Sequence, residues 1–161
     1  MSSRMVTFYE NLVAHLVAAE TLPEITERQV LFVTGAEEDE QIHAIDEHVK
    51  ERVMKTKGIA IVIFEGPVSN EDSVSLDDMI LAEMNFEVRL FVHPRKWGQK
   101  YDPTKRKARE ILEALVKVIN GAEIAPAERG CQDATFCDEF YPVPDPEFWA
   151  WNLEASRMMT L

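Results

Sequence analysis

The sequence has few cysteines, a shortage of basic residues and no long apolar run. Two cysteines, Cys131 and Cys137, lie close together in a loop-like stretch. Such a low number excludes a disulfide-rich secreted scaffold and favours a reduced pair in the cytosol, while a bond between the two stays open. The longest apolar run, Ile59 to Phe64, is far too short to cross a bilayer. The N-terminal residues lack the apolar core of a signal peptide, so we expect the protein to be made and used in the cytoplasm.

Negative charge dominates the composition. The chain carries 29 Asp and Glu against 17 Lys and Arg, which gives a formal net charge of −12. This balance argues against a general nucleic-acid binder and against docking on anionic membranes, because both need a basic surface. It also favours solubility and keeps free subunits apart. The length of 161 residues and the hydrophobic fraction of 46% fit a single globular domain over 1–161.

The clearest structural pattern runs from Met79 to Gly121. Apolar and polar side chains alternate over 79–93, which predicts one long strand with a buried face. A basic elbow over 95–101 follows, and Asp102-Pro103 predicts the start of a helix. Apolar residues then recur at helical spacing until Gly121, which predicts the helix end.

The other elements are predicted from shorter patterns. They are a helix over 5–17, a strand over 29–34, a helix over 37–57, a strand over 59–64 covered on both faces, and a last strand over 148–155. Gly66-Pro67 is expected to end a strand and begin a mobile acidic hairpin loop over 66–78. Because Pro142, Pro144 and Pro146 oppose regular structure, 122–147 is expected to be irregular. The predicted fold is α+β, with a mostly antiparallel sheet of about four strands packed by two to three helices.

Catalytic motifs are not evident, and we expect no metal and no cofactor. The histidines and cysteines have no spacing typical of a zinc site. Glu83, Glu87 and Arg89 share one strand face, and with Glu65 they could mark a metal-dependent nuclease. A solvated strand face with alternating charges is the commoner explanation.

The basic elbow is the stronger candidate for a functional surface. Its cations are interleaved with aromatic rings, and Lys105 to Lys107 would oppose the dipole of a helix that began there. In so acidic a protein, such a cluster can form one half of a self-complementary subunit interface. The other half would be the acidic residues of 71–78 or the acidic run 37–39, and a merely solvated helix start stays an alternative. The predicted interface residues are Arg89, Arg95, Lys96, Trp97, Lys100, Tyr101, Glu71, Asp72, Asp77 and Asp78.

Two segments and the order of elements resemble a known family. The segments are Phe86-Glu87-Val88-Arg89-Leu90-Phe91-Val92 and Ala108-Arg109-Glu110-Ile111-Leu112-Glu113-Ala114-Leu115. With the N-terminal helix, the paired strands and the late last strand, they resemble the tail terminator and tail completion proteins, the head–tail joining proteins of long-tailed phages.

The resemblance implies a virion subunit that is soluble alone in the host cytoplasm. It would form a homo-oligomeric ring, a hexamer, that caps the tail tube and contacts the head connector. It would not be an enzyme and would have no cofactor. Two alternatives from other classes stay open: the metal-dependent nuclease using Glu83 and Glu87, and a small acidic cytosolic binding module of the immunity or antitoxin type.

Overall fold

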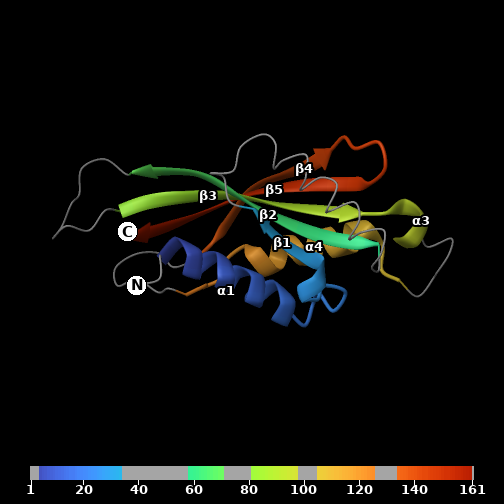
Figure 1. Ribbon diagram of the computed structural model, residues 1–161, viewed down its shortest axis with the longest axis horizontal. Coiled ribbons are helices and arrows are strands. Elements are labelled where there is room, and N and C mark those ends of the chain that lie inside the picture. The colour runs from blue at the N-terminus through green and yellow to red at the C-terminus, as the bar shows by residue number, and fades with distance from the viewer. Residues whose placement is uncertain (1–3, 34–57, 71–80, 98–104, 126–133, 161) are drawn as a thin grey trace.

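A five-stranded sheet with helices on one side forms the body of the protein (Figure 1). The computed structural model describes residues 4–33, 58–70, 81–97, 105–125 and 134–160, so the helix predicted over 37–57 lies outside the described residues. The helices are α1 (Arg4–Ala18), a 3₁₀ turn (Glu27–Gln29), α3 (Pro94–Trp97) and α4 (Ala108–Ile119). The strands are β1 (Val30–Val33), β2 (Ile59–Asn70), β3 (Leu81–Val92), β4 (Phe136–Val143) and β5 (Trp149–Thr160).

The strand order is β1-β2-β3-β5-β4. β1 runs parallel to β2, and the other three pairs are antiparallel. This confirms the predicted α+β class with a mostly antiparallel sheet, although the sheet has five strands instead of about four. The last strand lies inside the sheet, because β5 pairs with β3 on one side and with β4 on the other.

The alternating pattern of β3 sorts its side chains onto two faces, as predicted. Met84, Phe86, Val88 and Leu90 are at most 1% exposed, and they pack in one cluster with α1 and α4. We call this side the helical face. Ala60 and Val62 of β2 belong to a second apolar cluster on the opposite face. The prediction that the strand over 59–64 is covered on both faces is therefore confirmed for Ile59 to Ile63, all at most 3% exposed.

Both helices bury an apolar stripe against the sheet. Phe8, Leu12 and Leu16 of α1 are fully buried, as are Ile111, Leu115 and Ile119 of α4. α4 ends as predicted, because Gly121 has φ 80°, a backbone conformation that glycine adopts without strain. Its predicted start is wrong. Residues 105–107 are not helical, and α4 begins at Ala108.

Two segments predicted as irregular contain strands. Residues 66–70 continue β2, whose register against β3 shifts between Glu65 and Val68, the mark of a β-bulge. Pro67 lies in this bulge, and β1 pairs with β2 only as far as Phe64, so no described strand requires an N–H group from Pro67. Likewise, β4 occupies 136–143 within the predicted irregular segment, and it accepts Pro142 because it is the outermost strand.

Candidate subunit interface

The elbow between β3 and α4 is built around a buried tryptophan. Trp97 is 4% exposed, and its indole N–H donates to the carbonyl oxygen of Arg106 at 2.9 Å. The ammonium of Lys105 lies 4.8 Å from the centre of the Trp97 ring, within cation–π range. Trp97 thus belongs to the core, and it does not offer its ring to a neighbouring subunit as the sequence suggested.

Arg106 ties the elbow to the chain before β1. Its Nε and Nη2 atoms each donate to a carboxylate oxygen of Glu24 at 2.6 Å, and Nη2 also donates to the carbonyl of Thr21 at 2.8 Å. The hydrogen bond with Glu24 raises the pKa of Arg106. The inference from an opposed helix dipole was wrong, because 105–107 precede α4. The helix start is instead capped by Glu110, whose carboxylate accepts from the Lys107 N–H at 2.8 Å.

Arg89 forms part of a polar network across three strands. Its guanidinium lies 5.0 Å from the centre of the Phe64 ring, and its Nε donates to Asn152 Oδ1 at 3.3 Å. Asn152 Nδ2 donates to the Tyr141 hydroxyl at 3.0 Å, and that hydroxyl donates to Glu154 Oε1 at 3.0 Å. Asn152 is fully buried, so these bonds satisfy polar atoms that water cannot reach.

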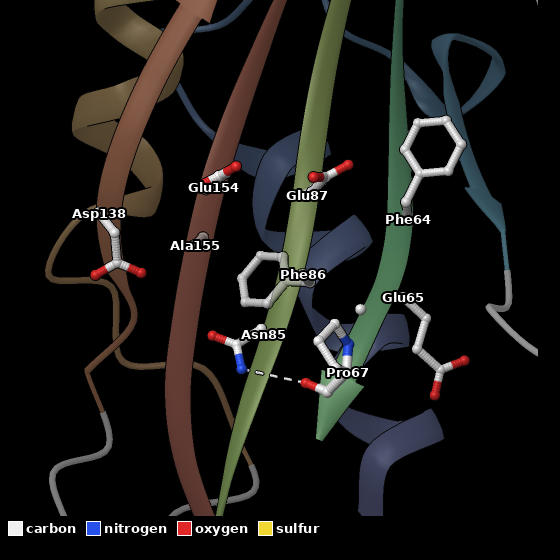
Figure 2. A pocket seen from close by; sticks show the side chains of 10 residues that line it. Phe64, Glu65, Pro67, Asn85, Phe86, Glu87, Asp138, Glu154 and Ala155 are labelled. Carbon is white, nitrogen blue, oxygen red and sulfur yellow. Dashed lines mark hydrogen bonds between the residues drawn. The ribbon is translucent and has the colours of Figure 1, made fainter. Parts of the chain in front are cut away.

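Carboxylates line a hollow beside this network. Its volume is about 460 Å³, and its walls include Glu65, Glu87, Asp138 and Glu154. Figure 2 shows Glu87 and Glu154 on the adjacent strands β3 and β5, where they are register partners. The β2 bulge forms the rim, with Asn85 Nδ2 donating to the carbonyl of Pro67 at 3.2 Å.

The carboxylates that the nuclease alternative requires do not converge. Glu83 and Glu87 lie four positions apart on β3, which is roughly 13 Å at about 3.3 Å per residue, too far for one metal ion. Glu65 is opposite Phe86 in register, so by alternation it belongs to the helical face. Within the ranges that the structure describes, no group of three His, Cys, Asp or Glu side chains could hold a metal.

Other predicted interface residues are only partly visible. Arg95 is exposed on α3. Lys96 belongs to the same helix, and the structure describes its backbone alone. The remaining predicted residues, Glu71, Asp72, Asp77, Asp78, Lys100 and Tyr101, lie outside the described residues. The proposed pairing of the elbow with the acidic loop over 71–78 therefore stays a prediction.

An apolar surface on the β4–β5 hairpin was not predicted from the sequence. Phe140 is 53% exposed and Trp149 is 46% exposed, and Pro142 is also exposed. These residues share the helical face, since Phe140 is opposite Leu153 and Trp149 is opposite Val92 in register. We call Phe140, Pro142 and Trp149 the hairpin stripe. Its signal in the sequence is the cluster of aromatic residues around 140–149, within a stretch whose prolines predict irregular structure.

Two comparisons by sequence with known proteins found no match for this chain. No protein-family model matches it, and no curated protein matches it by sequence. Among the described helices, none is both long enough and apolar enough to cross a membrane.

Proposed function

We propose that the chain is a structural subunit of the tail–neck region of a long-tailed phage. In this role it assembles with copies of itself into a ring that caps the tail tube and joins it to the head connector. The order of elements and the strand-then-helix unit over 81–119, through which the sequence resembles tail terminator proteins, support the proposal. The role is one of assembly, without a catalytic step.

The hairpin stripe is the observation that carries the proposal. Large exposed side chains such as Phe140 and Trp149 are isolated on most surfaces, but here they share one face of a two-stranded hairpin. Aromatic residues with part of their surface exposed are typical of the centres of protein interfaces. A subunit that stays soluble alone and then assembles needs such a surface together with a high net charge, here −12.

The experiment compares two exposed apolar residues that lie on different elements. Phe140→Ser removes the centre of the hairpin stripe, and Val6→Ser removes an apolar side chain, 48% exposed, from α1. The mass distribution of each protein is measured across a concentration series, alone and with purified tail tubes. Wild type and Val6→Ser should form a ring of a fixed number of copies. Loss of an interface aromatic costs on the order of 2 kcal/mol, so Phe140→Ser should need roughly 30-fold more protein to assemble.

A wild-type chain that stays monomeric at every concentration and never joins tail tubes would refute the proposal. Equal assembly of Phe140→Ser and Val6→Ser would remove the stripe as its basis. Stable binding of the monomer to a basic protein would instead favour the immunity-like alternative.

A further inference from the structure

The edge strand that carries Phe140 and Pro142 of the hairpin stripe also carries negative charge. Asp138 and Glu139 directly precede Phe140 on the edge strand β4, and both are exposed. The sequence from Ala134 to Ser156 contains Asp and Glu residues but no Lys or Arg. Glu139 is opposite Glu154 in register and Asp138 lines the hollow beside Glu154, so both carboxylates lie on the face of β4 that is opposite to Phe140. We call Asp138 and Glu139 the acidic border. The edge of the hairpin therefore presents aromatic rings on one face and carboxylates on the other, and each favours a cationic partner surface.

The same chain carries a matching cationic corner, formed by Arg95, Lys107 and Arg109. All three are exposed, and none forms an ion pair with another described residue, in contrast to Arg106. The hydrogen bond from Trp97 to the Arg106 carbonyl holds α3 beside the start of α4, so the elements that carry these cations lie together.

The acidic border and the cationic corner lie at different places on the subunit. α3 follows the end of β3 at Val92, which is opposite Trp149 at the start of β5. Asp138 lies near the other end of β4, five residues before Val143, so it is roughly 16 Å further along the sheet at about 3.3 Å per residue. A contact between two different surfaces of identical chains is heterologous, and it produces a ring when the rotation closes.

We propose that the hairpin stripe and its acidic border dock on the cationic corner of the next copy of this chain. The inference rests on the proposed function and names the two surfaces that form its ring. The next copy contacts the edge of β4 from both faces: its Arg side chains contact the rings of Phe140 and Trp149 on one face, and its other cations pair with Asp138 and Glu139 on the opposite face.

Side chains make this contact, and the sheet does not continue from one copy to the next. The outer edge of β4 carries Pro142, a register shift between Cys137 and Glu139, and two adjacent acidic residues. Each of these features discourages the addition of another strand.

Charge reversal provides the test. Asp138→Lys/Glu139→Lys makes the border basic, and Arg95→Glu/Arg109→Glu makes the corner acidic. In each variant alone, the border and the corner carry charge of the same sign and repel each other. The protein concentration at which half of the chains are assembled should therefore rise on the order of a hundred-fold. An equimolar mixture should assemble, because each basic border then meets an acidic corner and each acidic border meets a basic one. Glu10→Lys/Glu20→Lys on and after α1 is the control for the first variant, and Lys117→Glu on α4 is the control for Arg109→Glu; both should assemble like wild type.

The outcomes separate the two proposals. A wild-type chain that never assembles refutes the proposed function. If wild type assembles and the reversed variants assemble equally well, only the assigned surfaces are wrong. Folded variants that fail alone and also fail in the mixture refute the pairing of border with corner. If the lysine pair unfolds the chain, as judged by circular dichroism, Asp138→Asn/Glu139→Gln must weaken assembly at low salt, and normal assembly of that variant also refutes it.

Discussion

Gly66 lies close against the backbone of β3, and replacing it tests how the β2 bulge is built. A Cβ atom at this position would lie 2.5 Å from the carbonyl oxygen of Asn85 and 3.0 Å from its carbonyl carbon. Both atoms belong to the backbone of β3, so no side chain can rotate away to make room. Relief requires the bulge and the neighbouring strand to separate by several tenths of an ångström.

We expect Gly66→Ala to lower the free energy of unfolding by about 2 kcal/mol. Overpacking that shifts the backbone costs about 1–3 kcal/mol, and a smaller gain from restricting the unfolded chain offsets part of it. For a protein of this size, each kcal/mol lowers the melting temperature by about 2–4 °C, so the variant should melt about 4–8 °C below wild type. Thermal unfolding followed by circular dichroism measures this shift.

Gly121 provides the matched control, because a Cβ there would meet nothing within 4 Å while φ is +80°. Gly121→Ala should cost about 1 kcal/mol through the backbone conformation alone, and Gly121→Asn should cost less because Asn tolerates that conformation. At Gly66 the order reverses, since Asn is larger than Ala. A Gly66→Ala variant as stable as wild type, or a Gly66→Asn variant more stable than Gly66→Ala, would show that the close approach to Asn85 is wrong.

Two further predictions concern the elbow and the edge strand. Trp97→Phe keeps a buried ring but loses the hydrogen bond to the Arg106 carbonyl, so urea unfolding should show a loss of about 1 kcal/mol; an unchanged midpoint would contradict that bond. Burial and the charge of Asp138 raise the pKa of the Cys137 thiol, so the thiolate, which is the reactive form, appears only at higher pH. In a Cys131→Ser background, iodoacetamide should therefore label Cys137 more slowly in the folded protein than in a denatured control. Asp138→Asn should move the curve of labelling rate against pH to lower pH. A curve unmoved by that substitution would show that the carboxylate does not raise the pKa of the thiol.

Most of the fold could be predicted because its strongest patterns are local. The alternation in β3 and the helical spacing in α4 each identify a buried face within a single segment. The errors arose where local chemistry depends on neighbours. Pro67 and Pro142 lower the probability of a strand in any local pattern, yet both occupy positions at which none of the described strands needs their N–H group. Which strand forms an edge is a property of the sheet order, and no segment encodes that order by itself.

The candidate interface was harder to predict for the same reason. The sequence identifies a dense group of cations around 95–109, but it does not show which of them are used within the subunit. Arg106 is hydrogen-bonded to Glu24, more than eighty residues away in the chain, and Trp97 is buried in the core. Conversely, Phe140 resembles an ordinary core residue in sequence, and its exposure follows only from its position on the outermost strand.

The position of β5 between β3 and β4 affects how the subunit folds during translation. Until β5 leaves the ribosome, β2 is the only described strand that can pair with β3. The other edge of β3 then exposes a row of unpaired backbone N–H and C=O groups, beside side chains such as Phe86 and Val88 that are buried in the folded protein. Pairing Val92 with Trp149 requires the intervening chain to close a long loop, which slows folding. The nascent protein therefore passes through a stage that is prone to aggregation, and this stage ends only when β5, which is synthesised after β3 and β4, enters the interior of the sheet.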